Sequence, residues 1–129
     1  MRRQFLLLAA AALLSASAPA FAATELPFTT ANFVAARDAG KPILVDIWAS
    51  WCPTCAKQAP ILKSVAADPA NADLVILKVD FDAQRDLVYV LGARSQSTLI
   101  GFHGKTEVGR SVGDTRPESI AALAAACRN

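Results

Sequence analysis

The feature that most constrains this chain is a pair of cysteines, two residues apart, placed directly after a long apolar run. Residues 43–49 read Ile-Leu-Val-Asp-Ile-Trp-Ala, a composition typical of a strand buried on both faces of a sheet. This run is followed by Trp51-Cys52-Pro53-Thr54-Cys55, and proline is tolerated in the first turn of a helix. The sequence therefore predicts a central strand that leads into a helix over residues 52–67, with both thiols on its first turn.

This spacing suits reversible thiol chemistry. Two sulfurs on one helical turn can close a small disulfide ring or open to a dithiol. Free backbone N–H groups and the helix dipole stabilise a thiolate at the helix N-terminus, so we expect Cys52 to be the attacking nucleophile. Cys55 is expected to be the resolving thiol, less exposed and with the higher pKa. A zinc site would need further ligands, and the chain holds three Cys and one His. A purely structural disulfide would gain little from closing so short a loop.

The first residues have the pattern of an export signal. Arg2 and Arg3 precede an apolar run over residues 5–14, and small residues end at Ala20-Phe21-Ala22. This pattern predicts a secretory signal peptide over residues 1–22, cleaved after Ala22, followed by one domain over residues 23–129. The alternative is an uncleaved membrane anchor, because residues 5–23 could just cross a bilayer. Both alternatives place the domain outside the cytosol, and we expect a periplasmic protein.

Charge excludes some classes of partner. The chain has thirteen Lys and Arg residues against eleven Asp and Glu, and two of the basic residues lie in the leader, so the domain itself carries no formal net charge. Neither nucleic acid nor an anionic membrane surface is therefore an expected partner. We expect a monomer that acts on other proteins.

The remaining pattern alternates strands and helices. An extended lead over residues 25–28 and a helix over 30–39, capped by Thr30, precede the central strand. A second apolar strand over 74–81 is followed by a short helix over 83–91, capped by Asp82. A hairpin over 98–102 and 107–112 leads to a final helix over 116–128, for which Thr115 and Glu118 form a capping box. The core order βαβαββα predicts an α/β domain with a mixed sheet.

The stretch Val-Asp-Ile-Trp-Ala-Ser-Trp-Cys-Pro-Thr-Cys over residues 45–55 resembles the active-site strand and turn of the thioredoxin superfamily, and Pro60 matches its helix-kinking proline. The resemblance implies a three-layer α/β/α sandwich and a thiol–disulfide oxidoreductase that needs no cofactor besides its own cysteine pair. It also implies that Asp46 is the buried carboxylate beneath the thiols and that Lys78 is its charged neighbour. Burial of a lone carboxyl raises its pKa, as a general base near neutral pH requires.

Several residues are expected to contact substrate. Trp51 directly precedes the nucleophile, and Pro53 and Thr54 lie between the cysteines, whereas Trp48 and Cys127 are expected to pack in the interior. The family places a cis-proline before the hairpin, where this chain has Gln96-Ser97-Thr98. Because a cis bond before a non-proline residue costs about 3–4 kcal/mol, we expect a trans Gln96–Ser97 peptide and a reshaped loop. Without a proline ring, capture of a soft metal by the reduced thiols becomes a side hypothesis.

The dipeptide between the cysteines bears on the direction of electron flow. Strongly oxidising members of the superfamily carry a histidine there, and Pro53-Thr54 has no such cation. The pentapeptide is similar to that of membrane-tethered reductases of cytochrome c maturation. This resemblance implies a reductant of disulfides in exported proteins, supplied by a membrane thiol electron donor. Two alternatives stay open: a disulfide-forming oxidase, and a module that binds a metal through Cys52 and Cys55.

Overall fold

The central strand of the sheet is β2 (Pro42–Trp48), as its apolar sequence predicts. The computed structural model describes residues 22–129, so the predicted signal peptide lies outside the described residues apart from Ala22. β2 pairs in parallel with β3 (Val75–Asp80) and antiparallel with β4 (Thr98–His103). The edges of the sheet are β1 (Thr24–Pro27), parallel to β3, and β5 (Thr106–Val112), antiparallel to β4, in the order β1-β3-β2-β4-β5.

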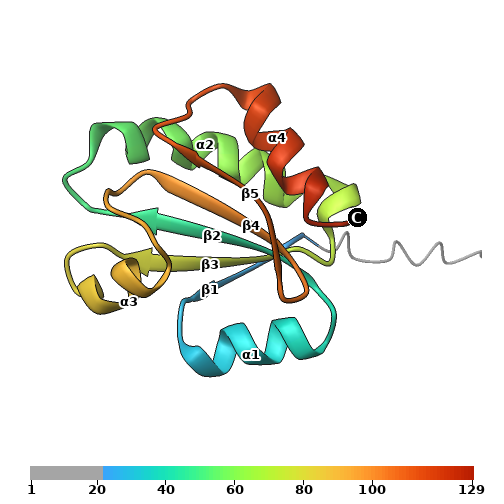
Figure 1. The fold of residues 1–129 in the computed structure, drawn as a ribbon. Helices are drawn as coiled ribbons and strands as arrows, with labels where there is room; N and C mark the ends of the chain where they lie inside the picture. Colours follow the sequence, from blue (N-terminus) through green and yellow to red (C-terminus); the bar gives the residue numbers. More distant parts are fainter. Residues whose placement is uncertain (1–21) are drawn as a thin grey trace, which may run out of the picture.

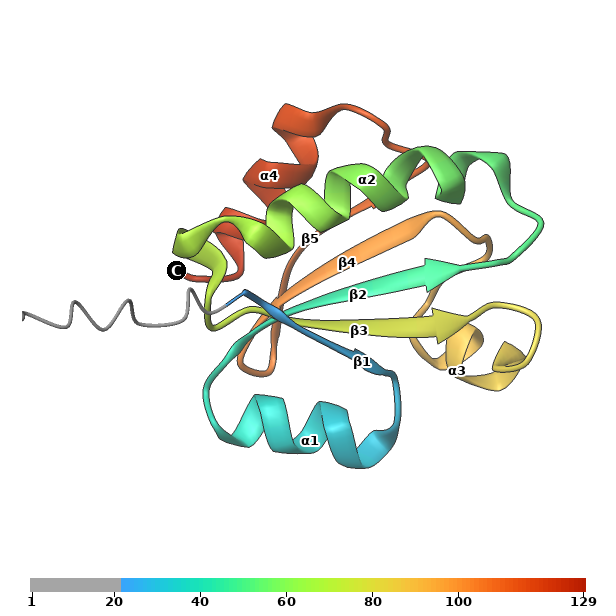
Figure 2. The ribbon, with the colours of Figure 1, turned by 180° about the vertical axis from the view of Figure 1, so that it is seen from behind.

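The helices complete a three-layer sandwich. Figures 1 and 2 show α2 (Pro53–Ala67) and α4 (Pro117–Ala126) on one face of the sheet, and α1 (Thr30–Asp38) and α3 (Arg85–Val90) on the other. The predicted thioredoxin-like α/β/α fold with a mixed sheet is therefore confirmed. The predicted extended lead forms the edge strand β1. Among the described residues, no helix is both long and apolar enough to traverse a bilayer.

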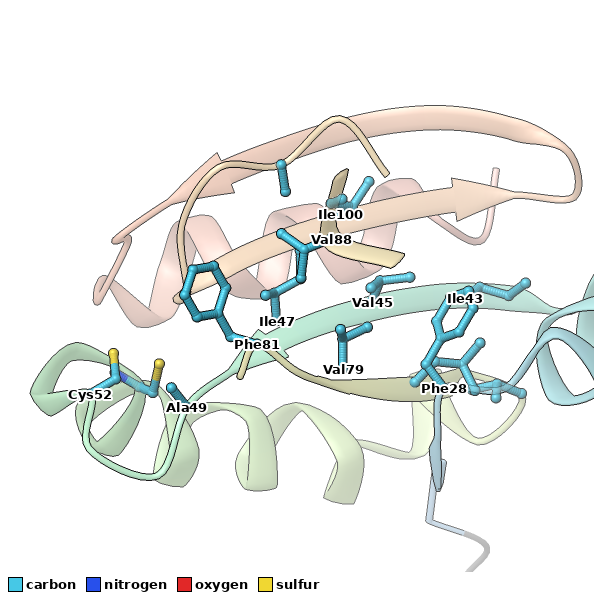
Figure 3. Packing of buried hydrophobic residues seen from close by; sticks show 14 of the residues in the cluster. Phe28, Ile43, Val45, Ile47, Ala49, Cys52, Val79, Phe81, Val88 and Ile100 are labelled. Carbon is cyan, nitrogen blue, oxygen red and sulfur yellow. The ribbon is translucent and has the colours of Figure 1, made fainter. Parts of the chain in front are cut away.

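Strand alternation divides the core in two. Ile43, Val45 and Ile47 of β2 belong to a cluster with residues of β3, α1 and α3, part of which is drawn in Figure 3. Leu44, on the opposite face of β2, packs in a second cluster with α2 and α4. Side chains along a strand alternate between faces, so Asp46 shares the α2 face with Leu44. The only acidic residue of β2 therefore lies beneath the helix that carries the thiols.

Three predicted helix caps were wrong. Thr29, rather than Thr30, caps α1 through a bond from the Asn32 N–H to its hydroxyl, 3.0 Å long. α3 begins at Arg85 rather than residue 83, because the Asp80 carboxylate accepts the N–H groups of Asp82 and Ala83 and holds them in a turn.

The third wrong cap is the box predicted from Thr115 and Glu118. Helix α4 begins at Pro117 behind Arg116, whose side chain makes no capping hydrogen bond. Instead, the Asp114 carboxylate accepts the N–H of Arg116 at 3.0 Å.

Two glycines let α4 approach the sheet closely. Gly101 on β4 pairs with Gly109 on β5, and a Cβ atom added at Gly101 would lie 2.8 Å from the Cys127 sulfur and 3.1 Å from Cδ1 of Leu123. Cys127 is fully buried, and its thiol donates to the Leu123 carbonyl at 3.2 Å. The interior packing predicted for Cys127 is confirmed.

The two ends of the described chain lie together. Both ribbon views place the start of β1 and the end of α4 at one end of the sheet, and the N-terminus of α2 at the other. The first backbone hydrogen bond runs from the Ala23 N–H to the Ala66 carbonyl, 2.9 Å long, near the end of α2.

Candidate active site

The two cysteines lie where β2 gives way to α2. Cys52 is the N-cap of α2 and Pro53 occupies its first turn, as the sequence predicts. The Cys55 N–H donates to the Cys52 sulfur at 3.1 Å, and both thiols are free. Figure 3 shows Cys52 at the end of the first core cluster, near Ala49. A sulfur that accepts a backbone N–H at a helix N-terminus is suited to carry the negative charge of a nucleophile.

Burial does not distinguish the two thiols. Cys52 is 4% exposed and Cys55 is 3% exposed, so their roles depend on hydrogen bonding and not on a difference in access. Burial and, next, the hydrogen bond with Cys52 raise the pKa of Cys55 to about 11, against smaller opposing effects of backbone hydrogen bonds from Ala49 and Ser97. Cys55 is therefore a protonated thiol at neutral pH, and its attack on a mixed disulfide requires a proton acceptor.

Asp46 has the properties of such an acceptor. Its residue is 8% exposed, and burial raises the pKa of its carboxyl to about 6, partly offset by the Lys78 cation and reinforced by Glu25. It lines a pocket of about 710 Å³ between α2 and β3, together with Lys78, Trp48 and Ala59. A carboxyl with this pKa is ionised at neutral pH yet close enough to titration to take up a proton.

Lys78 is Asp46's register partner on β3. Its ammonium nitrogen lies 4.1 Å from the centroid of the Trp48 ring, a cation–π contact that holds the charge beside the pocket. Trp48 is half-buried against the first core cluster, in agreement with the packing role predicted for it.

Replacing Asp46 with asparagine should separate its catalytic role from its cost to stability. Because the pKa of Asp46 is 3.8 when exposed and about 6 when buried, the unfolded chain loses this proton first and stability falls as pH rises between the two values. We expect Asp46→Asn to be more stable than the parent above pH 6, by up to about 3 kcal/mol, and equal to it near pH 4.

The same variant should resolve the mixed disulfide about tenfold to a hundredfold more slowly than the parent at neutral pH. Thermal unfolding between pH 4 and 8 and the decay of the mixed disulfide measure the two effects. If the variant resolved the mixed disulfide at the parent's rate between pH 6 and 8, Asp46 would have a structural role only.

Trp51 is held beside the nucleophile with half of its surface open. The residue is 56% exposed, its indole N–H donates to the Asp82 carboxylate at 2.7 Å, and its ring meets Phe81 edge-on at 6.4 Å. Arg85 lies over the other ring of this pair, with its guanidinium carbon 4.1 Å from the Phe81 centroid. Sequence reasoning missed Asp82 as a site residue, although its position just after β3, at the same end of the sheet as Cys52, was a usable signal.

The loop before β4 departs from a proline-type turn. No cis peptide occurs among the described residues, so the trans bond predicted for Gln96–Ser97 is confirmed. Ser97 has a φ of +56° and is 6% exposed. Its N–H donates to the Ile47 carbonyl at 2.7 Å, and its carbonyl accepts the Gly113 N–H at 2.9 Å. A proline at this position could not donate the first of these bonds.

The other residues predicted to contact substrate differ in access. Pro53 is exposed, and Thr54 and Gln96 are half-buried. Thr98 is buried, with its hydroxyl donating to the Ser95 carbonyl at 2.8 Å. The structure thus brings Trp51, the thiols and the Ser97 loop to one end of the sheet. Within residues 22–129, no group of three or more His, Cys, Asp and Glu side chains is arranged to hold a metal ion.

Comparison with known proteins identifies a family. The thioredoxin family model matches residues 25–126. A thioredoxin from Alicyclobacillus acidocaldarius subsp. acidocaldarius is 37% identical over 98 residues, covering 75% of this chain and 91% of the relative. The bifunctional thioredoxin reductase/thioredoxin of Mycobacterium leprae (strain TN) is 36% identical over 93 residues, which cover 71% of this chain but 20% of that larger protein. The crystal structure of Trxlp from Edwardsiella tarda EIB202 superposes with a TM-score of 0.74 at 39% identity, covering 78% of this chain and 97% of that one.

Proposed function

Because the chain belongs to the thioredoxin family of thiol–disulfide oxidoreductases, we propose that it reduces disulfides of exported proteins in the periplasm. The Cys52 thiolate attacks a substrate disulfide, forms a mixed disulfide and releases one substrate thiolate, which takes up a proton. Cys55 then gives its proton to Asp46 and attacks the Cys52 sulfur. This attack forms the Cys52–Cys55 disulfide and releases the second substrate sulfur as a thiolate, which takes up a proton from solvent. A membrane protein that carries thiol electrons would return the pair to the dithiol.

The observation that carries the reducing direction is that neither residue between the two cysteines carries a positive charge. Pro53 and Thr54 are uncharged, and the one histidine of the chain, His103, contacts the Cys127 carbonyl through Nδ1 at 2.9 Å, away from the thiols. A strongly oxidising pair requires extra stabilisation of its thiolate form. Here the Cys52 sulfur accepts the Cys55 N–H, and neither residue between the cysteines adds a positive charge.

Export is supported by the leader pattern. The leader pattern that begins with Arg2 and Arg3 ends at Ala22, and among the described residues Ala23 is the first whose backbone N–H bonds to the domain. Cleavage after Ala22 would leave every described hydrogen bond of the domain in place. N-terminal sequencing of protein recovered from the periplasmic fraction would test this proposal, with Ala23 as the expected first residue. Recovery of the full-length chain from membranes would support the anchor alternative instead.

A redox titration of the thiol pair tests the direction of electron flow. We expect a reduction potential close to the value of about −270 mV found for thioredoxin, measured by equilibration with glutathione or dithiothreitol buffers. A potential near −120 mV would identify a disulfide-forming oxidase. Tight metal binding by the dithiol, with negligible turnover of a disulfide substrate, would identify a metal-binding module.

A further inference from the structure

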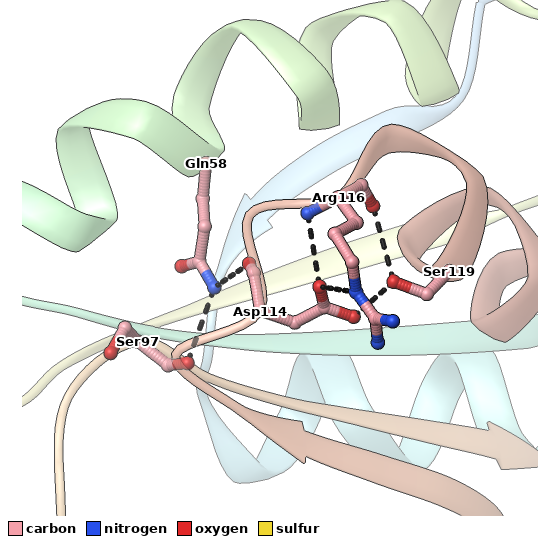
Figure 4. Close-up of polar contacts among 5 residues, drawn as sticks. All are labelled: Gln58, Ser97, Asp114, Arg116 and Ser119. Atoms are coloured by element: carbon pink, nitrogen blue, oxygen red, sulfur yellow. Dashed lines mark hydrogen bonds and ion pairs between the residues drawn. The ribbon is translucent and has the colours of Figure 1, made fainter.

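A buried glutamine follows the resolving cysteine on α2. Gln58 is 1% exposed and lies three residues after Cys55, which is the spacing of neighbours on one helix face. Its side-chain nitrogen donates to two backbone carbonyls, Ser97 at 3.2 Å and Asp114 at 2.9 Å. Figure 4 shows this amide reaching from the helix to two loops that are far apart in the sequence. One side chain therefore ties the active-site helix to both the loop before β4 and the loop after β5.

The Asp114 end of this contact is itself anchored. The Asp114 carboxylate accepts the N–H and the Nε–H of Arg116, at 3.0 and 3.2 Å, and also the hydroxyl of Ser119. These bonds, drawn in Figure 4, fix Asp114 to the start of α4. They also lower the pKa of the Asp114 carboxyl, the Ser119 bond most of all. The position of the Asp114 carbonyl that Gln58 bonds is therefore fixed by contacts that do not involve Gln58.

The Ser97 end lies against the thiols. Ser97 has a left-handed φ of +56°, a conformation that is strained for a non-glycine residue, so other contacts must hold it. Those contacts are the N–H bond to Ile47 and the carbonyl bonds from Gly113 and Gln58. No proline ring fixes this loop, and hydrogen bonds must do so instead.

A contribution to stability does not explain the buried amide of Gln58. Its side-chain oxygen is buried and has no hydrogen-bond partner among the described residues. Such an unsatisfied acceptor lowers the stability of the folded state, and an apolar side chain of the same length would avoid that cost. The amide is therefore best explained by its two donor contacts.

We propose that Gln58 is a positioning residue that holds the Ser97 and Asp114 loops against α2, and that these loops form one wall of a groove beside the thiols in which a polypeptide substrate lies. It does not touch the reacting sulfurs in this role. It fixes the backbone of the Ser97 and Asp114 loops, along which a protein substrate would lie. This fixing is needed because the Ser97 loop has no proline. This inference rests on the proposed reduction of polypeptide disulfides.

Two disulfide substrates separate positioning from chemistry. Insulin requires the groove, whereas dithiobis(nitrobenzoic acid), a small aromatic disulfide, requires only the thiols. We expect Gln58→Met, which keeps the length but cannot donate, to lower kcat/KM for insulin by about tenfold or more, mainly through KM. Its rate with the small disulfide should stay within about twofold of the parent's. Amide hydrogen exchange at Ser97 and Gly113 should accelerate in the same variant.

Asn71→Leu is the matched control. Asn71 is also a buried amide, 4% exposed, and it donates to the Val65 carbonyl of α2 at 2.9 Å, at the end of the helix away from the thiols. Its loss removes a buried amide that bonds the other end of α2 and should leave the ratio of the two rates unchanged. An unchanged ratio in Gln58→Met, or an equal change in Asn71→Leu, would overturn the inference. Failure of the parent protein to reduce insulin, with the small disulfide still reduced, would instead contradict the proposed function.

Discussion

Cys52→Ser is expected to abolish disulfide reduction, lowering the rate by at least about a thousandfold, because a serine hydroxyl is a far weaker nucleophile toward a disulfide than a cysteine sulfur. The Cys52 sulfur accepts the Cys55 N–H at the start of α2, and a serine hydroxyl could accept the same N–H, so the start of the helix should be retained. The Cys55 thiol, with its pKa raised to about 11, cannot replace it as the attacking group near neutral pH. Turnover of insulin with dithiothreitol as electron donor measures the loss.

Cys55→Ser should have a different result. Attack by Cys52 survives but resolution does not, so the variant should accumulate mixed disulfides with its substrates. Non-reducing gel electrophoresis after acid quenching should show these adducts, and they should disappear on reduction. Equal capture of substrates by both variants would contradict the assignment of roles.

The second large effect concerns stability. We expect Gly101→Ala to lower the free energy of unfolding by about 1–3 kcal/mol, because the new methyl group would lie 2.8 Å from the buried sulfur of Cys127. That sulfur belongs to a fully buried residue at the end of α4, and Cδ1 of Leu123 lies 3.1 Å from the same position. Urea-induced unfolding at equilibrium gives the difference between variant and parent.

A double-mutant cycle identifies the cause of this loss. Removing the sulfur with Cys127→Ala should reduce the cost of Gly101→Ala by about 1 kcal/mol, since the two groups would otherwise collide. Gly109→Ala is the control, because its added Cβ would meet only the flexible end of Leu123, at 3.0 Å. If the losses of unfolding free energy caused by Gly101→Ala and Cys127→Ala were additive, the added methyl group would not be colliding with the Cys127 sulfur.

The sequence predicted the reactive part of the site well because local and tertiary signals agree there. An apolar β-branched run favours a buried strand, and Pro53 favours the first turn of a helix, so both signals place Cys52 at the junction. Asp46 was proposed from the resemblance to the thioredoxin superfamily, and its position as the one charge in an otherwise apolar run agrees with its burial on the α2 face of the sheet.

The remaining site residues depend on contacts that no local pattern encodes. Gln58 reads as an ordinary polar helix residue, and only the meeting of two loops 39 and 56 residues away shows that its amide is buried and bonded. The helix caps failed for a related reason. Asp80 and Asp114 accept backbone N–H groups just before α3 and α4 and hold those segments in turns, so each helix begins later than its predicted cap requires. Local spacing does not show which of two neighbouring side chains will bond the backbone in this way.

The placement of the chain ends has a practical consequence for anything attached to them. The start of β1 and the end of α4 lie at the end of the sheet opposite Cys52. A tether, affinity tag or surface linkage joined at either end would extend away from the reactive sulfurs. Immobilised protein should therefore keep its thiols facing outward, and a retained leader in a membrane would present the same face to passing substrates as the freely diffusing domain does.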